Sequence, residues 1–399
     1  MTSILLTCLL IPSVQWAPLF DAKTKDLYIQ RGGQAEFAIE GNTVTGKTVA
    51  GSPNSFLCTF QEFGDFELEY EVFVDPALNS GVQIRSNSVL GYKDGVVHGY
   101  QIEIDPTDAT RSGGLYDESR RGWLQDPATN PSAPKAFQNG QWNKFRVVAK
   151  GDHIQSWING KPVTDFHDDL TRSGFIALQV HSSDKSGQTV KWRNVRIKDL
   201  GIQESTPPKG GHWILHQLSD LQNFTAQGRS ERPNPWIWKD DAMETDPGKG
   251  GIESKEKFKD MQLHLEFMVD ENGKTGQENG NSGVYLAGSY EVQILNSVPR
   301  GPLINECGAI YNIKAPDYAM AKPAGQWQTY DITFTAPKYK EGQKVANARI
   351  TSYHNGTLIH KDVEVPHETG SGRPESDQPK GFTIQDHGHR IRFRNIWVK

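Results

Sequence analysis

The sequence predicts an all-β protein made of two tandem β-sandwich domains. Three features lead to this prediction: apolar and polar residues alternate along extended stretches, Asn-Gly turn signals separate such stretches, and most of the chain consists of two diverged copies of one unit. The length of 399 residues excludes a single small domain, and 39 Gly with 22 Pro are typical of a turn-rich β protein.

The internal duplication sets the domain organisation. Its collinear blocks pair EFGDFELEYEVFVDPALNSGVQIR (62–85) with KFKDMQLHLEFMVD…GNSGVYLA (257–287), GYQIEID (99–105) with SYEVQIL (289–295), GGLYD (113–117) with GAIYN (308–312), GQWNKFRV (140–147) with GQWQTYDI (325–332), WINGKPV (157–163) with YHNGTLI (353–359), GFIALQVHS (174–182) with GFTIQDHG (381–388), and WRNVRIKDL (192–200) with FRNIWVK (393–399). We therefore predict domains at 18–200 and 212–399, joined by a Pro- and Gly-rich linker at 201–211.

Within each copy the pattern is that of antiparallel strands. In the first copy Phe66, Leu68 and Tyr70 alternate with charged residues, which indicates a half-buried strand. Asn159-Gly160 and Asn355-Gly356 stand between apolar stretches, and this dipeptide favours a two-residue hairpin turn because both turn residues need positive φ. Convincing helical patterns are absent from the sequence, so two stacked sheets are expected in each domain.

Composition excludes several classes of function. The net charge of −5 comes without a basic stripe, and no apolar run reaches the roughly 18–20 residues of a membrane helix, so neither nucleic-acid binding nor a membrane span is expected. Three scattered cysteines do not form a disulfide framework. The apolar run ILLTCLLI (4–11) has signal-peptide length but no preceding basic residue. We interpret residues 1–17 as a degenerate export signal, with an ordinary buried strand as the alternative, and expect an extracytoplasmic protein.

The repeated blocks carry a family resemblance. NSGVQIR, GYQIEID, RSGGLYDESRRGWL, QWNKFRV and RNVRIKDL of the first copy, and NSGVYL, YEVQIL, GQWQTYDI, QDHG and FRNIWV of the second, resemble the 3-keto-disaccharide hydrolase domain family. The resemblance implies a concanavalin A-like jelly roll for each domain, an extracytoplasmic setting, and action on an oligosaccharide or keto-glycoside oxidised at carbon 3.

Two pairs of polar residues are the main candidates for the site. Gln101, Glu103 and Asp105 follow one another at every second position, so their side chains should leave one face of a strand. The second copy has Glu291 and Gln293 at the first two of these positions, which keeps one carboxylate and one amide. A solvated outer face is the alternative interpretation.

The second pair is Gln179 with His181, and its counterpart is Gln385 with His387. Histidine transfers protons near neutral pH, and an amide can donate to a sugar hydroxyl or a developing oxyanion. A structural histidine in a turn is the alternative. His389 adds a second histidine only in the second copy, and two histidines without a fixed third ligand do not define a metal site.

The first copy alone adds Arg85, Arg121 and Trp123, because Ala287 replaces Arg85 and the RRGWL segment has no clear match. Guanidinium groups can bind keto or hydroxyl oxygens and an indole can stack on a sugar ring, although a surface arginine is often only solvated. We therefore predict a catalytic first copy, with Glu103 and His181 as catalytic residues and the other polar residues as substrate ligands.

The chemistry expected from the resemblance is elimination followed by rehydration. A ketone at carbon 3 acidifies the proton on carbon 2, so a base such as Glu103 or His181 can remove it and the group on carbon 1 can leave. Arg85, Gln101 or a divalent metal could stabilise the enolate, and no redox cofactor is needed. Whether a metal is used, the linkage cleaved and the oligomeric state stay open.

Two alternative functions remain. A lectin-like protein would bind sugars without cleaving them, since sandwiches of both kinds look alike in sequence. Glu103-Ile-Asp105-Pro-Thr-Asp108 also resembles the E-x-D-x-x-E strand of laminarinase-type glucanases. Its last carboxylate is an aspartate rather than a glutamate, and the second copy does not keep the pattern, so retaining hydrolysis by Glu103 ranks below the keto-sugar reaction.

Overall fold

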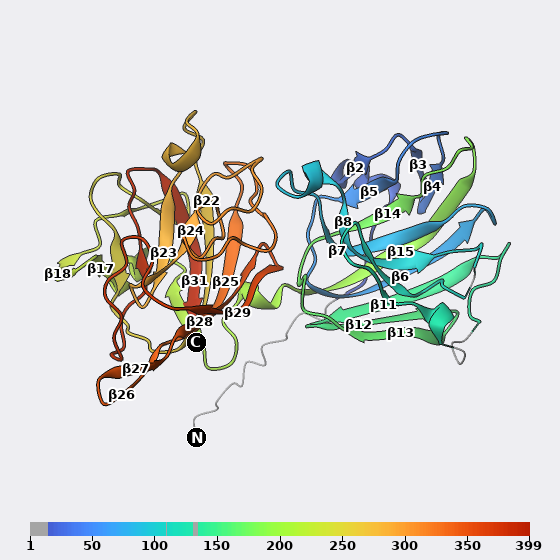
Figure 1. Cartoon of the computed structure of the whole chain (residues 1–399). Coiled ribbons are helices and arrows are strands. Elements are labelled where there is room, and N and C mark those ends of the chain that lie inside the picture. Colours follow the sequence, from blue (N-terminus) through green and yellow to red (C-terminus); the bar gives the residue numbers. More distant parts are fainter. Residues whose placement is uncertain (1–14, 109, 131–134) are drawn as a thin grey trace, which may run out of the picture.

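The structure is a computed structural model that describes residues 15–108, 110–130 and 135–399, and it contains two β-sandwiches that follow one another along the chain (Figure 1). The predicted export signal lies mostly outside the described residues, since residues 1–14 are not among them. In the described ranges no helix has the length and apolar character needed to cross a bilayer.

The first sandwich has an eight-stranded and a seven-stranded antiparallel sheet. In spatial order the larger sheet is β13 (Lys161–His167), β12 (His153–Ile158), β11 (Asn143–Lys150), β6 (Asp65–Val74), β15 (Thr189–Gly201), β4 (Thr43–Lys47) and β3 (Glu36–Glu40), with β1 (Ala17–Pro18) also paired to β15. The smaller sheet is β10 (Gly122–Gln125), β9 (Leu115–Glu118), β8 (His98–Ile104), β7 (Ser80–Asn87), β14 (Phe175–Val180), β5 (Ser55–Thr59) and β2 (Tyr28–Gly32).

The second sandwich repeats this plan. Its eight-stranded sheet is β19 (Ile237–Lys239), β20 (Ala242–Glu244), β31 (Ile391–Val398), β22 (Met261–Val269), β25 (Gln328–Thr335), β28 (Ala348–His354) and β29 (Thr357–Val365), with β16 (His212–Leu215) paired to β31. Its six-stranded sheet is β18 (Arg229–Pro233), β17 (Phe224–Ala226), β21 (Ile252–Ser254), β30 (Thr383–Ile384), β23 (Ser282–Leu286) and β24 (Tyr290–Ile294). A hairpin of β26 (Lys338–Lys340) and β27 (Gln343–Ala346) projects from it.

Helical structure in the described ranges is limited to short 3-10 turns. They are η1 (Ala22–Leu27), η2 (Lys93–Gly95), η3 (Pro127–Thr129), η4 (Gln203–Ser205), η5 (Leu218–Asn223) and η6 (Gly276–Glu278). The chain is therefore all-β, as the periodicity of the sequence predicts, and each domain is a jelly-roll-like sandwich of two antiparallel sheets.

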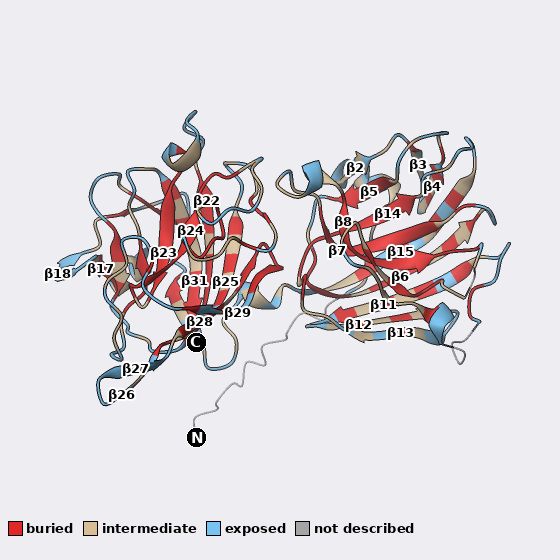
Figure 2. Cartoon of the chain, viewed as in Figure 1, coloured by how far each residue is buried: buried red, intermediate tan, exposed pale blue. Residues whose placement is uncertain are grey.

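Each sandwich has its own apolar core between its two sheets. The strands of both sandwiches are largely red in Figure 2, the colour of buried residues. Along β6, Phe66, Leu68, Tyr70 and Val72 are at most 1% exposed, whereas Glu67 and the glutamates that follow it at every second position are only half-buried. The predicted alternation is confirmed, and burial of the apolar face supplies the main driving force for folding.

The two Asn-Gly hairpins are also confirmed. Asn159 and Gly160 have φ of 50° and 79° and join β12 to β13, and Asn355 and Gly356 have φ of 50° and 74° and join β28 to β29. Positive φ at both positions is the geometry of a type I′ turn, whose twist matches that of the flanking strands.

A bulge on the outer face of each large sheet explains four repeated residues. In β15 Asn194 has φ of 52°, and its Nδ2 donates to Glu71 at 2.9 Å, while Arg193 also binds Glu71 and lies 4.0 Å from the ring centre of Trp142. The second domain repeats this cluster with Asn395, Glu266, Arg394 and Trp327, where the cation–ring distance is 3.9 Å. The duplicated Trp, Arg, Asn and Glu positions are therefore structural.

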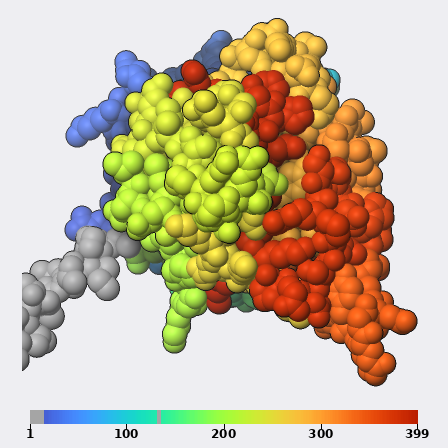
Figure 3. All heavy atoms as spheres, turned by 90° about the vertical axis from the view of Figure 1, so that its left-hand side faces the viewer, coloured from blue at the N-terminus to red at the C-terminus, as the bar shows by residue number. Residues whose placement is uncertain are grey.

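The linker is fixed by contacts to both domains. The carbonyl oxygen of Glu204 accepts a hydrogen bond from Trp397 Nε1 at 2.7 Å, and the Glu204 carboxylate lies 3.0 Å from Arg172 Nη1 of the first domain. Arg172 in turn lies 3.6 Å from the ring centre of Tyr353. Beyond the linker the yellow-green chain lies beside the red C-terminal segments (Figure 3), where β16 pairs with β31.

Arg85 is part of the fold and not of a binding surface. It has φ of 46°, where the pairing of β7 with β8 is irregular, and its side chain is 1% exposed. The guanidinium donates to the carbonyl oxygens of Gly64 and Gly151 at 2.8 and 2.6 Å and to the Asp65 carboxylate at 3.0 Å. The prediction that Arg85 binds substrate is wrong, because its guanidinium is buried and already bound to these groups.

We expect Arg85→Ala to lower the free energy of unfolding of the first domain by about 3–5 kcal/mol, because it leaves the buried Asp65 carboxylate without its cationic partner. Urea unfolding followed by circular dichroism measures this loss. Lys47→Ala is the control: it removes an exposed ion pair with Glu36 at 3.7 Å and should cost less than about 1 kcal/mol. Equal losses for the two variants would contradict a structural role for Arg85.

Candidate functional site

The candidate site lies on the polar face of the seven-stranded sheet of the first domain. Along β8, Tyr100, Ile102 and Ile104 are fully buried in the core, so Gln101 and Glu103 leave the opposite face of the sheet. Both polar side chains are nevertheless at most 5% exposed. This face is therefore a packed polar layer and not the solvated surface of the alternative interpretation.

A directed chain of hydrogen bonds ends on Glu103. Ser86 Oγ donates to Gln83 Oε1 at 2.7 Å, Gln83 Nε2 donates to Gln101 Oε1 at 2.6 Å, and Gln101 Nε2 donates to Glu103 Oε2 at 3.0 Å. Asn79 Nδ2 donates to the other oxygen, Oε1, at 2.6 Å. Because every donor points toward the carboxylate, Glu103 is the common acceptor, and the chain stabilises its ionised form.

The pKa of Glu103 reflects two opposed influences. Burial raises it, while the hydrogen bonds from Asn79 and Gln101 lower it, and the nearby charges of Asp105 and Glu118 raise it further. The balance is a pKa of about 7. A carboxylate with that pKa exchanges a proton near neutral pH, which is the property required of a general base or acid.

A glycine makes room for this arrangement. A Cβ atom on Gly81 of β7 would lie 2.3 Å from Gln101 Cδ, so only glycine at this position leaves room for the Gln101 side chain beside Glu103. The second domain keeps the same device, because a Cβ atom on Gly283 would lie 2.2 Å from Glu291 Oε1. The glycine of the repeated Asn-Ser-Gly sequence, at the start of β7 and of β23, is thus required for the polar layer in both copies.

Glu118 on β9 connects the polar layer to Gln179 and His181. Gln179 is fully buried, and its Nε2 donates to Glu118 Oε2 at 3.4 Å. Burial raises the pKa of Glu118, and the charge of His181 opposes that rise, which places His181 within electrostatic range of Glu118. The hydrogen bonds that the structure gives His181 go to Ser182, and none joins the described His181 and Glu103 directly.

Two aromatic rings border the layer. Tyr116 on β9 stands opposite both Gln101 on β8 and Trp123 on β10, and the rings of Tyr116 and Trp123 meet edge to face at 5.2 Å. Burial and the charges of Glu118 and Glu103 raise the pKa of Tyr116, so its hydroxyl stays protonated at neutral pH. Trp123 is half-buried and lies beside the polar row, where an indole could contact a sugar ring.

Two other predicted substrate ligands, Arg121 and Asp105, form hydrogen bonds and ion pairs within the protein. Arg121 binds Asp117 through Nε at 2.5 Å and both oxygens of Asp168 through Nη1 and Nη2 at 2.9 and 3.0 Å. Asp105 Oδ1 accepts from the backbone N–H of Thr107 at 3.0 Å and of Asp108 at 3.2 Å, as the cap of a turn. These contacts shape the loops around the site.

The counterpart in the second domain is built differently. Glu291 accepts from Tyr285 Oη at 2.8 Å, and burial raises the pKa of Glu291 to about 7 despite that hydrogen bond. Gln385 Nε2 lies 3.5 Å from the same tyrosine oxygen. The backbone near Gly370 crosses this face, because a Cβ atom there would lie 2.8 Å from Glu291 Oε2. The second carboxylate is therefore covered by a loop of its own domain.

Gln293 and His387 stand apart from that carboxylate. Gln293 Nε2 donates to Gln277 Oε1 at 3.1 Å, and His387 is exposed, with its ring parallel to that of His389 at 5.8 Å. Among the described contacts of the second domain, only Gln385 joins Glu291 through a shared partner.

Each oxygen of Glu103 accepts one amide N–H, Oε1 from Asn79 and Oε2 from Gln101, and keeps a further lone pair. The use of a divalent metal in the reaction stays a prediction.

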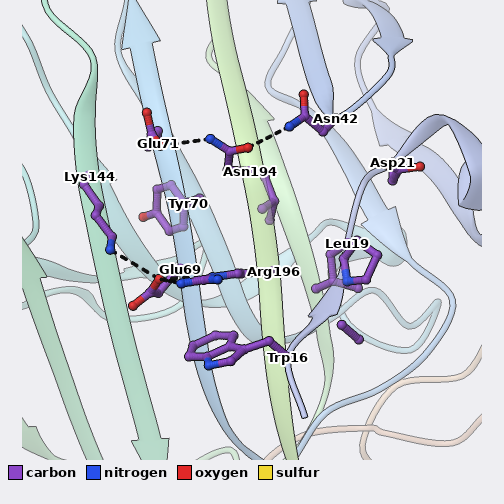
Figure 4. A pocket seen from close by; sticks show the side chains of 13 residues that line it. Trp16, Leu19, Asp21, Asn42, Glu69, Tyr70, Glu71, Lys144, Asn194 and Arg196 are labelled. Carbon is purple, nitrogen blue, oxygen red and sulfur yellow. Dashed lines mark hydrogen bonds and ion pairs between the residues drawn. The ribbon is translucent and has the colours of Figure 1, made fainter.

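A separate groove of about 500 Å³ lies on the outer face of the large sheet (Figure 4). Trp16 borders it and packs on Arg196 at 4.8 Å, while Asn42 and Asn194 line its far side. Arg196 and Lys144 both bind Glu69, so the charges of this groove are paired with one another. Its chemistry is that of a binding surface, and no proton-transferring group with a shifted pKa resembling Glu103 lies among these residues of the described chain.

Sequence reasoning identified Gln101 and Glu103 but missed Asn79, Gln83 and Glu118. Asn79 and Gln83 belong to the Asn-Ser-Gly block, and the repetition of Asn and Gly in both copies could have indicated a role near Glu103. Glu118 lies in a segment without a clear second-copy match, so the repeat gives no signal for it.

A family model described as the 3-keto-alpha-glucoside-1,2-lyase-like domain matches residues 15–198 and again residues 218–399. The chain belongs to this family. No curated protein matches the chain.

Several solved structures are similar to one domain of this chain. A "putative glycosyl hydrolase" from Parabacteroides distasonis ATCC 8503 is 28% identical, with a TM-score of 0.44, and the match covers 49% of this chain and 88% of that one. The carbohydrate-binding module CBM66 from Bacillus subtilis is 16% identical, with a TM-score of 0.33, over 43% of this chain and 96% of that one. The family supports a carbohydrate-active protein.

The raised pKa of Glu103 predicts a pH-dependent stability. The folded pKa of about 7 lies above the ordinary glutamate value of 4.5, so the stabilising contribution of the neutral form is complete below pH 4.5 and is lost as pH rises through 7. Glu103→Gln cannot ionise, so between pH 5 and pH 8 we expect its free energy of unfolding to gain roughly 2–3 kcal/mol relative to wild type. Chemical unfolding at several pH values measures this difference.

The same substitution at the exposed Glu36 controls for the chemical change itself. A constant difference between wild type and Glu103→Gln from pH 5 to pH 8 would contradict the shifted pKa.

Proposed function

We propose that the protein cleaves the glycosidic bond of 3-keto-glycosides, and that the first domain carries the reaction. The observation that supports this most is Glu103, a buried carboxylate with a pKa of about 7 at the end of a directed amide chain, in a domain of the 3-keto-alpha-glucoside-1,2-lyase-like family.

The proposed reaction begins with proton removal at carbon 2 of the keto sugar. The ketone at carbon 3 stabilises the resulting enolate, the carbanion's electron pair forms the double bond, and the aglycone leaves carbon 1 with the bonding pair. Glu103 takes the proton, because its ionised form is available near pH 7 and is held by Asn79 and Gln101. Water adds to the double bond in the second half of the reaction.

Other polar groups of the layer supply binding and the second proton transfer. Gln179 Oε1 is buried and has no hydrogen-bond partner among the described residues, so it is suited to accept from a sugar hydroxyl. Glu118 and His181 form the neighbouring proton-transfer pair, which can protonate the departing oxygen. Trp123, at the border of this layer, is placed to contact the sugar ring.

The first domain is favoured over the second because of what covers each carboxylate. The backbone N–H of Glu291 donates to Thr369 Oγ1 at 2.6 Å, and the next residue in the chain, Gly370, lies over the Glu291 carboxylate. A sugar would have to displace that segment before it could reach Glu291. The contacts of Glu103 are side-chain amides, which can exchange a hydrogen bond with a ligand by rotation.

A second function, sugar binding without cleavage, is favoured by the groove of Figure 4. An indole beside amide and carboxylate groups is a common surface for carbohydrates, and Trp16, Asn42 and Asn194 supply these types of group. The groove lies on the opposite sheet from Glu103, so the two functions can be tested separately.

Turnover of a 3-keto disaccharide tests the enzymatic proposal. We expect cleavage of the oxidised sugar and not of the unoxidised disaccharide. Each assay is run with and without a chelator, so that any dependence of turnover on a metal ion is measured. Glu103→Gln should lower kcat/KM at least about tenfold, equal to about 1.4 kcal/mol of barrier. In wild type kcat/KM should rise with pH through about 7, as the Glu103 carboxylate ionises.

Glu291→Gln is the matched control and should keep wild-type turnover. Loss of turnover in Glu291→Gln with full activity in Glu103→Gln would assign the reaction to the second domain. Cleavage of both sugars would support a laminarinase-like hydrolase, and binding of both without cleavage would support the lectin-like function.

Trp16→Ala tests the groove. If the groove binds oligosaccharide, this variant should weaken binding measured by calorimetry at least about fivefold, because an aromatic contact contributes roughly 1 kcal/mol or more. Turnover at saturating substrate should stay unchanged, since Trp16 lies on the other sheet. Trp142→Ala, which removes the tryptophan beneath Arg193 outside the groove, is the control. Equal binding by all three proteins would exclude the groove as a sugar site.

A further inference from the structure

Two histidines and an aspartate meet on the outer face of the edge hairpin β12–β13. His153 on β12 stands directly across from His167 on β13, and Asp165 lies two residues before His167 on the same strand. The alternate positions Ile154 and Ser156 are buried, so His153 and its two neighbours project away from the core. One ligand atom from each of the three side chains lies within 4.8 Å of the other two.

The two imidazole rings lie side by side. His153 and His167 stack with their centres 4.2 Å apart and an angle of 6° between their planes. Imidazole nitrogen is a common ligand of Zn²⁺ and related ions, so the stacked pair brings two nitrogen donors to one surface.

Neighbouring groups orient each donor. Asp152 Oδ1 lies 3.1 Å from His167 Nδ1, so that N–H can donate to the carboxylate and leave the other ring nitrogen available. Gln155 Nε2 donates to Asp165 Oδ2 at 3.3 Å, while Asp165 Oδ1 lies 2.6 Å from His153 Nε2. Such outer partners fix the tautomer and the direction of metal ligands in proteins.

We propose that His153, His167 and Asp165 form a binding site for a divalent transition-metal ion of the Zn²⁺ type. A metal ion would replace the proton shared by His153 Nε2 and Asp165 Oδ1. Tetrahedral zinc has bonds of about 2.0–2.2 Å to nitrogen and oxygen, which places two of its ligand atoms about 3.3–3.6 Å apart, so these two atoms must separate by roughly 0.7–1.0 Å. Both side chains are partly exposed and can move by that amount. Water completes the fourth position.

The second domain shows that this donor set is a property of the first domain alone. Counted back from the Asn-Gly turn, the position of His153 is occupied in the second domain by Arg349. Arg349 binds the Asp362 carboxylate through Nε at 2.5 Å and Nη2 at 2.8 Å. A guanidinium stays protonated and cannot ligate a metal ion. The two copies thus stabilise the same hairpin in two ways, by a fixed ion pair in one and by a metal-binding set in the other.

The site is separate from the candidate catalytic layer. The β12–β13 hairpin is at the edge of the eight-stranded sheet, whereas Glu103 is on β8 in the opposite, seven-stranded sheet. The inference therefore does not depend on the proposed reaction, and metal binding can be measured without turnover.

Calorimetric titration of the full chain with ZnCl₂ tests the proposal, using tag-free protein treated with EDTA and dialysed into a non-chelating buffer. We expect one Zn²⁺ per chain at this site. His153→Ala and His167→Ala should each weaken its binding at least tenfold. The electron paramagnetic resonance spectrum of bound Cu²⁺ should show two coupled imidazole nitrogens in wild type and one in each variant.

His212→Ala is the matched control and should bind as wild type does, because His212 forms an exposed pair with the single carboxylate of Glu256 at 2.7 Å. Circular dichroism checks that each variant is folded. The proposal is overturned by an absence of binding at 1 mM (about 4 kcal/mol of affinity), or by wild-type affinity in either His153→Ala or His167→Ala. Loss of binding in His387→Ala, whose ring stacks on His389, would place the ion in the second domain and also overturn it.

Discussion

The burial of a carboxylate on the outer face of a sheet is the constraint on which the candidate site depends. Glu103 is 5% exposed, and a charge removed from water must be matched by donors. The amides of Asn79 and Gln101 meet that requirement, and Gln83 and Ser86 extend it across the next strand. These hydrogen bonds offset only part of the effect of burial, so the pKa of Glu103 is about 7. The ability of Glu103 to exchange a proton near neutral pH therefore follows from its removal from water.

The two copies keep the residues that hold the backbone of the sandwich and differ in the polar residues on the smaller sheet. The bulges at Asn194 and Asn395 and the glycines under Gln101 and Glu291 recur because backbone geometry requires them. The carboxylate and the amide exchanged places: the first domain has Gln101 and then Glu103 at its two same-face positions, whereas the second has Glu291 and then Gln293. The donors to the carboxylate changed with this exchange, from amides to the hydroxyl of Tyr285.

The sequence predicted the fold well because period-two alternation and Asn-Gly turns are local signals. It also placed Gln101 and Glu103 on one face, since both lie in a regular strand. It failed at Arg85, because the φ of 46° at this residue interrupts the alternation and turns its side chain toward Asp65. His181 lies just past the end of β14 at Val180, so the same-face rule no longer fixes its direction. Both failures arise where the regular strand conformation is interrupted or ends, and the alternation of apolar and polar residues does not locate these positions.

One contact between the domains reaches the candidate site through the segment 168–171. Arg120, next to the Glu118 region of β9, donates to Thr171 Oγ1 at 2.7 Å, and Thr171 pairs with Thr357 of the second domain. The backbone N–H of Leu358 also donates to the carbonyl oxygen of Leu170 at 2.8 Å. Because the same residues 168–171 anchor both the β9–β10 hairpin and the second domain, a shift of one domain against the other would strain the support of Glu118. The second domain thus supports the hairpin that borders the polar layer, which gives a physical reason for keeping the second copy beside the first.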